Sequence, residues 1–210
     1  MTGLFSIYKA LAATAVAYLE GLSLVQIKAV LEGVSGIPGR FELVDAGQDF
    51  TVIVDYAHTR DGLENVLRAV REFAPARVLT VFGCGGDRDR TKRPLMGEEA
   101  GRYSDYCVVT SDNPRTEEPE EIIAEILPGL LRTIGAGGFE IQPDRRDAIA
   151  RALQLAQAND IVVIAGKGHE TTQIFSERTI PFDDRQIARE LIQRRGETNG
   201  DDTKGNLRGS

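Results

Sequence analysis

The stretch Tyr106-Cys-Val-Val-Thr-Ser-Asp-Asn-Pro-Arg-Thr-Glu117 decides the fold, because it joins an apolar strand to a helix through a short polar loop. Pro114 cannot donate to a sheet ladder and disfavours the helical region for the residue before it, so the strand ends there. Beyond the loop, Glu117-Glu-Pro-Glu120 places acids in the first turn of an amphipathic helix, where the helix dipole favours them.

The same alternation of strand and helix extends in both directions from this stretch. Apolar runs predict strands at 50–55, 77–82, 106–110, 139–142 and 160–165, with a further candidate at 171–175. Helical spacing of apolar residues predicts helices at 61–73, 94–102, 119–132, 144–158 and 183–194, the fourth capped by Asp144. We therefore expect an α/β fold with a Rossmann-like, mostly parallel sheet and helices on both faces.

The first 39 residues follow a different pattern. Helices are predicted at 4–19 and at 23–31, the second beginning with a capping Ser23, and no strand accompanies them. Three glycines and a proline at 33–39 are typical of a hinge. At the other end, residues 196–210 lack apolar periodicity and are expected to be disordered.

Composition narrows the classes of function. The chain has 210 residues, 41% of them hydrophobic and 27% charged, and its net charge of −7 argues against binding a nucleic-acid backbone. It has no apolar run of membrane length and no signal-peptide pattern, so we expect a cytoplasmic protein that does not enter a membrane. Cys84 and Cys107 lie beside apolar runs and are expected to be buried thiols, with no metal-ligand spacing.

Polar loops follow four of the predicted strands, and the carboxyl ends of parallel strands share one edge of the sheet. The loops are 55–61, 83–90, 111–115 and 166–170. Each signal is weak alone: Asp61 caps a helix in the simpler interpretation, His58 is then a turn residue, and Lys167-Gly-His169 a solvated turn. The glycine-rich loop lacks the ending of a Walker A motif. Together, four polar loops on one edge favour a binding site.

The loop Asp112-Asn-Pro-Arg115 suits an amino-acid ligand. Its arginine offers a carboxylate clamp, and its aspartate and asparagine offer acceptors for an ammonium group. The alternative is an ordinary turn, in which Asp112 and Asn113 cap the next helix and Arg115 lies in solvent.

Five motifs together resemble the carboxyl-terminal domain of the Mur ligases, and especially of the members that add diaminopimelate. They occur in the family's order, and they are Asp55-Tyr-Ala-His-Thr59, Phe82-Gly-Cys-Gly-Gly-Asp-Arg-Asp89, Lys92-Arg-Pro-Leu-Met96, Asp112-Asn-Pro-Arg-Thr-Glu-Glu-Pro119 and Gly166-Lys-Gly-His-Glu170. The resemblance implies that residues 39–195 form this domain and that residues 1–38 are the last helices of a central ATP-binding domain with its hinge.

The resemblance also implies the ligands. The residues expected to hold meso-diaminopimelate are Arg88, Asp112, Asn113, Pro114, Arg115, Gly166 and Glu170, and those expected on the ATP side are Arg40, Asp55, His58 and Asp61. The implied reaction activates a carboxyl of UDP-N-acetylmuramoyl-dipeptide as an acyl phosphate, with ATP and Mg²⁺, for attack by the diaminopimelate amine.

The family's P-loop, magnesium ligands and UDP-sugar domain have no counterpart in the sequence, so we expect ligation to need a separate ATPase part. No residue here is expected to be catalytic or to bind metal. Two alternatives stay open: a non-catalytic module that binds diaminopimelate or docks on an ATPase subunit, and a related ligase of the folylpolyglutamate or cyanophycin type. The sequence departs from the family pattern at Arg60, where proline is usual, and at Ser6 and Lys9, where asparagines are common.

Overall fold

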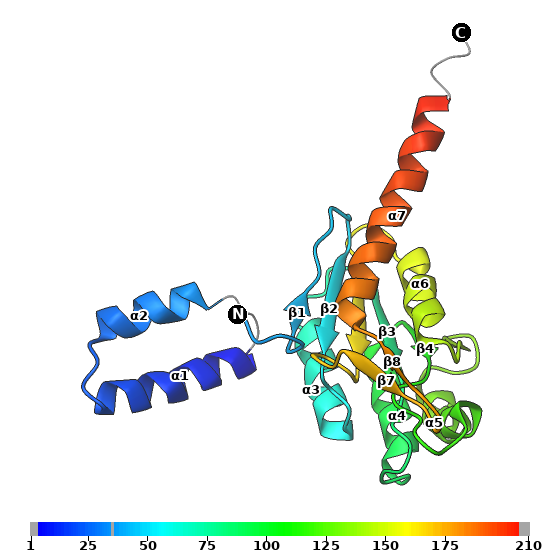
Figure 1. Cartoon of the computed structure of the whole chain (residues 1–210), viewed down its shortest axis with the longest axis horizontal. Coiled ribbons are helices and arrows are strands. Elements are labelled where there is room, and N and C mark those ends of the chain that lie inside the picture. Colours follow the sequence, from blue (N-terminus) through cyan, green and yellow to red (C-terminus); the bar gives the residue numbers. More distant parts are fainter. Residues whose placement is uncertain (1–3, 35, 206–210) are drawn as a thin grey trace.

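The structure is a computed structural model that describes residues 4–34 and 36–205. A helical hairpin, α1 (Leu4–Leu19) and α2 (Leu24–Gly33), projects from an α/β domain (Figure 1). Ser23 caps α2 in a reciprocal capping box with Gln26, as the sequence predicts for the start of this helix. Both predicted helices are confirmed.

The domain is built on a six-stranded sheet with the order β1-β2-β6-β3-β4-β5. Only β1, at one edge, is antiparallel to its neighbour. The strands are β1 (Glu42–Leu43), β2 (Thr51–Asp55), β3 (Val78–Phe82), β4 (Tyr106–Val109), β5 (Phe139–Ile141) and β6 (Ile161–Ala165), and a separate hairpin joins β7 (Thr172–Ile174) to β8 (Thr179–Pro181). The predicted mostly parallel sheet is therefore confirmed. Its strands β2 to β6 begin and end within two residues of the predicted ranges.

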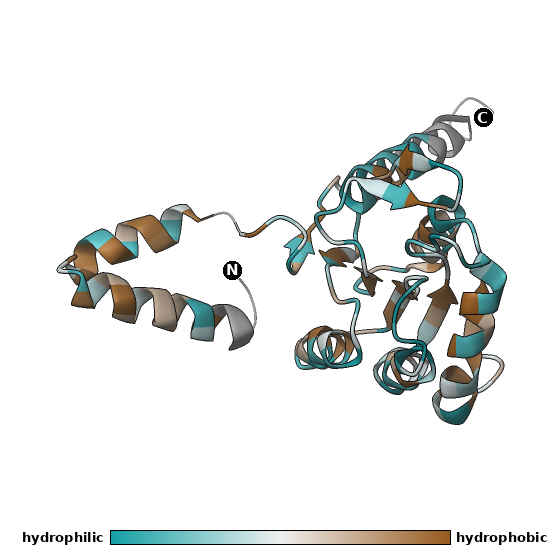
Figure 2. Cartoon of the chain, turned by 60° about the horizontal axis from the view of Figure 1, so that its bottom comes forward, coloured by the Kyte–Doolittle hydropathy of each residue, from teal (hydrophilic) through white to brown (hydrophobic). Residues whose placement is uncertain are grey.

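Helices cover both faces of this sheet, as predicted, because side chains of each strand alternate between two apolar clusters. Ile53 and Val163 face the cluster under α3, α4 and α5, whereas Val52 and Val162 face the cluster under α6 and α7. Figure 2 shows the apolar strands enclosed between helices whose outer surfaces are polar. The helices are α3 (Arg60–Arg71), α4 (Lys92–Tyr103), α5 (Pro119–Thr133), α6 (Arg145–Leu155) and α7 (Asp184–Gly205).

Three local features differ from the sequence expectations. The short strands β1 and β8 were not predicted, since two or three residues carry too little periodicity to register. Helix α7 continues to Gly205, so the expected disorder is wrong for residues 196–205, while 206–210 lie outside the described residues. Once a helix is nucleated, each added residue contributes one hydrogen bond at low cost, and no proline interrupts this segment.

Within the described ranges, no helix has both the length and the apolarity needed to cross a membrane. Both cysteines are free and buried, as predicted, and burial raises the pKa of each thiol to about 12.

Helices α4 and α5 cross so closely that glycine is required between them. A Cβ on Gly129 would lie 1.9 Å from the carbonyl oxygen of Pro94 and 2.5 Å from the amide nitrogen of Glu98. Alanine normally stabilises a helix interior by about 0.5–1 kcal/mol relative to glycine. At position 129 the close crossing of the two helices makes glycine the more stable residue instead.

We predict that Gly129→Ala lowers the free energy of unfolding by about 1–3 kcal/mol, because the added methyl group overpacks the crossing. Urea denaturation measures the effect. Gly137→Ala is the control, since a Cβ there meets nothing within 4 Å. A Gly129→Ala chain as stable as the control would contradict this packing.

Candidate functional site

The four polar loops lie on one edge of the sheet, as predicted, because the strands that precede them are parallel neighbours. The order β2-β6-β3-β4 brings together the loops that follow Asp55, Ala165, Phe82 and Val109. The last strand of this sheet in sequence order, β6, lies between β2 and β3, so the loop at 166–170 occupies the middle of this edge.

Three side chains from two of these loops form a polar cluster. The Asn113 side-chain amide donates to Glu170 Oε2 at 2.8 Å, and Lys167 Nζ donates to the same oxygen at 3.1 Å and to Asn113 Oδ1 at 3.0 Å. Burial opposes ionisation of Glu170, but the hydrogen bonds from Asn113 and Lys167 hold its pKa below the usual range. Glu170 therefore presents an ionised carboxylate beside an oriented amide.

Asp112 lies next to this cluster, with its Oδ1 4.0 Å from Lys167 Nζ, and is almost fully buried. Burial raises the pKa of its carboxyl, while Arg145 and Lys167 favour the ionised form. Gly166 lies against it with φ +122°, and a Cβ there would stand 2.7 Å from Asp112 Oδ2. Glycine is thus required at 166 both by its conformation and by the aspartate.

The two arginines of the predicted site both lie near Gly85 of the glycine-rich loop. Arg115 donates from one terminal nitrogen to the Gly86 carbonyl at 2.7 Å, and its backbone is held at φ +55° with its amide bonded to Ile174. Arg88 is exposed on the same loop, and a Cβ on Gly85 would lie 2.9 Å from Arg115 and 3.8 Å from Arg88.

Pro114 joins these loops through its carbonyl, which stands 1.8 Å from the position of a Cβ on Gly86. The Gly86 amide also donates to the Asn113 carbonyl at 2.9 Å. The glycines at 85 and 86 therefore let the two loops interlock at van der Waals distance.

Three of the four residues expected on the ATP side, Arg40, Asp55 and His58, form a second group around Tyr56. The Arg40 guanidinium lies 4.6 Å from the centre of the Tyr56 ring, and the rings of His58 and His169 lie 4.4 Å and 4.9 Å from it. Asp55 ties this group to the sheet, because its two oxygens accept from the amides of Phe41 and Ala57 at 2.7 and 2.8 Å.

Asp61 lies apart from this group, exposed in the first turn of α3. Thr59, and not Asp61, caps that helix by accepting from the Gly62 amide. Arg60, one of the departures from the family pattern, binds the buried Glu99 of α4 at 2.8 Å, which gives it a structural role.

A close backbone contact joins the two groups. A Cβ on Gly39 would lie 2.0 Å from the His169 amide, and one on Gly168 would lie 2.6 Å from both the Gly39 carbonyl and Tyr56 Cβ. The loop at 166–170 therefore contacts Gly39, in the predicted hinge, through Gly168 and the His169 amide, while Lys167 and Glu170 face Asn113.

A buried ion pair missed by the sequence analysis anchors this edge. Arg145, at the start of α6, binds Asp184 through two nitrogens at 2.9 and 2.8 Å, and both side chains are fully buried. Arg145 also donates to the carbonyls of Ser111 and Ala165, where β4 and β6 end. Nothing in the periodicity around Arg145 distinguishes it from the neighbouring, half-exposed Arg146.

Lys167 and Tyr56 were also not assigned roles from the sequence. The simpler interpretation of Lys167-Gly-His169 as a solvated turn is wrong for Lys167, which is 0% exposed. Its buried position depends on strand order, since Asn113 and Glu170 come from loops 57 residues apart.

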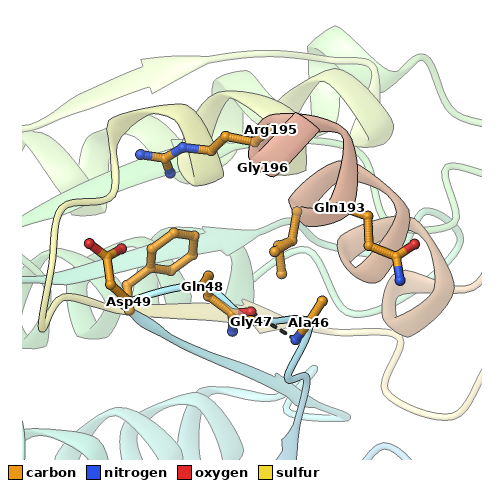
Figure 3. A pocket seen from close by; sticks show the side chains of 9 residues that line it. Ala46, Gly47, Gln48, Asp49, Gln193, Arg195 and Gly196 are labelled. Atoms are coloured by element: carbon orange, nitrogen blue, oxygen red, sulfur yellow. Dashed lines mark hydrogen bonds between the residues drawn. The ribbon is translucent and has the colours of Figure 1, made fainter. Parts of the chain in front are cut away.

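A separate hollow of about 310 Å³ lies at the opposite edge of the sheet, between the turn that leads into β2 and helix α7 (Figure 3). It is lined by Ala46, Gly47, Gln48, Asp49, Phe50, Ile192, Gln193, Arg195 and Gly196. Arg195 lies over the Phe50 ring and donates to the Leu153 and Ala156 carbonyls, so its guanidinium connects α7 to the end of α6.

In the described part of the chain, no three His, Cys, Asp or Glu side chains gather in a way that could hold a metal ion. Asp55, the predicted site carboxylate on the ATP side, already accepts two backbone hydrogen bonds.

Comparison with known proteins gives a consistent family. The family described as "Mur ligase, glutamate ligase domain" matches residues 39–168. The UDP-N-acetylmuramoyl-L-alanyl-D-glutamate–2,6-diaminopimelate ligase of Syntrophomonas wolfei is 58% identical over 193 residues, which are 92% of this chain and 39% of the relative. The enzyme of the same name from Geobacillus thermodenitrificans is 53% identical over 93% of this chain and 40% of its own length.

Solved structures agree in fold. One described as a UDP-N-acetylmuramoyl-L-alanyl-D-glutamate–2,6-diaminopimelate ligase has a TM-score of 0.73 at 38% identity, over 93% of this chain and 40% of that chain. A folylpolyglutamate synthase from Mycobacterium tuberculosis has a TM-score of 0.63 at 24% identity, over 79% and 38%, which shows a shared fold alone. The chain thus spans about two fifths of the length of the curated relatives described above.

We predict that Arg145→Met lowers the free energy of unfolding by about 3–5 kcal/mol, because it leaves Asp184 charged, buried and unpaired. Replacing both partners, as Arg145→Met with Asp184→Leu, should recover most of the loss, which a double-mutant cycle by denaturant unfolding measures.

Arg146→Met is the matched control. Its ion pair with Glu190 is about 40% exposed on both sides, so its loss should be below about 1 kcal/mol. Equal losses for the two arginine variants would show that the Arg145 pair does not anchor the fold.

Proposed function

The chain belongs to the Mur ligase family, and we propose that it supplies the amino-acid-binding domain of an ATP-dependent ligase that adds meso-diaminopimelate to UDP-N-acetylmuramoyl-L-alanyl-D-glutamate in peptidoglycan synthesis. The relatives at 53–58% identity carry that activity in their names, and the chain spans about two fifths of their length. The cytoplasm, where nucleotide precursors and ATP occur together, is the proposed location.

The observation that carries this proposal is a site with two chemical ends. Glu170, oriented by Asn113, provides a hydrogen-bond acceptor for an ammonium group, with the buried Asp112 adjacent. Arg115 at the end of the same loop and the exposed Arg88 on the glycine-rich loop offer guanidinium groups to carboxylates. Diaminopimelate has two ammonium groups and two carboxylates, so it has partners for both ends, whereas lysine lacks the second carboxylate.

Pro114 and Gly166 contribute through the backbone. Pro114 and Gly86 set the separation of the two loops, and Gly166 leaves room for Asp112. These residues therefore belong to the proposed diaminopimelate site by shaping it.

The group around Tyr56 is proposed to face ATP. Arg40 is exposed and stacked on Tyr56, which leaves its guanidinium available to phosphate oxygens. We include Asp55, His58 and Asp61 on this side. Asp55 accepts a hydrogen bond from the Phe41 amide beside the predicted hinge, the His58 ring contacts Tyr56, and Asp61 lies in the first turn of α3.

In the proposed reaction, ATP converts a carboxyl of the nucleotide precursor to an acyl phosphate, and the amine of diaminopimelate attacks its carbonyl carbon to form an amide with release of phosphate. Mg²⁺ neutralises phosphate charge during this transfer. The residues of this chain bind and orient the amine. The sequence contains no P-loop motif, so the phosphate cradle must come from another part of the enzyme.

A second proposed function, docking on an ATPase part, is favoured by the helical hairpin. Leu11, Val16, Tyr18, Leu19 and Val25 are each at least 58% exposed on α1 and α2. Figure 2 shows this apolar hairpin standing away from the sheet domain. An apolar surface of this kind favours a protein partner, consistent with a separate ATPase lobe.

We predict that the chain binds meso-diaminopimelate and that L-lysine binds at least about 100-fold more weakly, because lysine has no second carboxylate to form charge-assisted hydrogen bonds with Arg115 and Arg88. Arg115→Met should narrow this difference to about tenfold or less, since it removes the guanidinium but retains similar bulk. Calorimetric titration with both ligands measures the ratio.

Arg68→Met is the control, because Arg68 is 52% exposed on α3 and pairs with Glu64 away from the site. It should leave both affinities unchanged. Equal binding of lysine and meso-diaminopimelate by the unaltered chain would contradict the proposed substrate.

A further inference from the structure

Lys167 is a buried cation at the centre of the candidate site, and neither the motifs nor the comparisons give it a role. Its side chain is 0% exposed, and its ammonium lies 3.0 Å from Asn113 Oδ1, 3.1 Å from Glu170 Oε2 and 4.0 Å from Asp112 Oδ1. Burying an ammonium is costly unless hydrogen bonds and opposite charges compensate, and these three oxygens do so.

The contacts of Lys167 fix the orientation of Asn113. Oδ1 of Asn113 receives hydrogen bonds from the Lys167 ammonium and, at 3.0 Å, from the Ile174 amide. An ammonium has donors only, so the Asn113 carbonyl must face Lys167 and its NH₂ group must face Glu170. Both hydrogen bonds to Glu170 use Oε2, which leaves Oε1 as the oxygen available to a ligand.

Lys167 also sets the charge of the site. The groups that face it, directly or through Asp112 and Glu170, are Glu170, Asp112, Arg145, Asp184 and His169. Three of these groups are acids, and Lys167 and Arg145 are the cations in direct contact with them. Removing Lys167 takes away the cation that Glu170 and Asp112 share, and carboxylates that close together compete for a proton.

We propose that Lys167 is a positioning residue, which aligns Asn113 with Glu170 and keeps Glu170 ionised as the acceptor for the amino group of the incoming amino acid. The ligand in this statement rests on the proposed function, whereas the effect of Lys167 on Glu170 belongs to the ligand-free chain. The two parts are therefore tested separately.

The first test follows the ionisation of Glu170 without ligand. The side-chain carboxyl ¹³C resonance of Glu170, assigned through Glu170→Gln, is titrated from pH 2.5 to 6 in the unaltered chain and in Lys167→Met. Loss of a cation about 3 Å away should move the midpoint upward by about one pH unit or more. An unchanged midpoint in Lys167→Met would overturn the proposal, since a role in packing alone would not set this midpoint.

The second test measures binding of meso-diaminopimelate at pH 7. Lys167→Met should weaken it about tenfold or more, the loss expected when a hydrogen bond to a charged group is removed. Lys28→Met, which removes a lysine that is 74% exposed on α2, is the control and should bind like the unaltered chain. Equal affinity in Lys167→Met and Lys28→Met would count against the proposal.

If the unaltered chain does not bind diaminopimelate, the proposed substrate fails while the Glu170 titration still decides the role of Lys167. If Lys167→Met does not fold, the unaltered chain decides by hydrogen exchange at the lysine ammonium groups. The Lys167 ammonium should exchange at least about tenfold more slowly than that of Lys28. Equal exchange rates would show that Lys167 is not held between Asn113 and Glu170, and would overturn the proposal.

Discussion

The buried pair of Arg145 and Asp184 is the interaction on which the rest of the candidate site depends. Two charges removed from water stabilise a fold only when their geometry is good and their remaining donors are satisfied. Arg145 meets this condition with two hydrogen bonds to Asp184 and one each to the Ser111 and Ala165 carbonyls. The Ser111 carbonyl lies just beyond the end of β4 and the Ala165 carbonyl lies at the end of β6, so the pair fixes the spacing of two strands that are not neighbours in the sheet. Asn113 and Glu170 lie in the loops that follow these strands, so the hydrogen bond between them depends on that spacing.

A second constraint joins the proposed amino-acid end of the site to its proposed ATP end. Gly39 and Gly168 approach until no Cβ fits between them, and Asp55 clamps Phe41 beside that contact. Gly168 of the loop at 166–170 thus lies against the predicted hinge, while Lys167 and Glu170 of the same loop lie against Asn113. The proposed amino-acid end and the proposed ATP end therefore share a direct backbone contact.

The sequence predicts the elements of this domain well and their side-chain networks poorly, for a physical reason. Strands such as 160–165 and loops such as 111–115 are encoded by local patterns of apolar residues, glycine and proline, and the rule for parallel strands then predicts a shared edge. The order of strands is a non-local property. Only when β6 lies between β2 and β3 does Lys167 become buried and Tyr56 meet both histidines. Helix α7 was predicted to end too early because the apolar pattern stops after Ile192, whereas the helix continues to Gly205.

The hydrogen bonds present without ligand bear on how such a site can select its substrate. Arg115 already donates to the neutral Gly86 carbonyl, so its guanidinium is not wholly unsatisfied when the carboxylate end of the site is empty. A ligand that lacks a second carboxylate therefore incurs less than the full penalty of a buried, unpaired charge. Discrimination must come mainly from the gain on exchanging a neutral carbonyl for a carboxylate, because a charge-assisted hydrogen bond is roughly twice as strong. The ammonium end behaves differently, since Glu170 gives one oxygen to Asn113 and Lys167 and retains the other. In the proposed site, one end would therefore accept any amino group of suitable reach, and the arginine end would distinguish among the molecules that carry it.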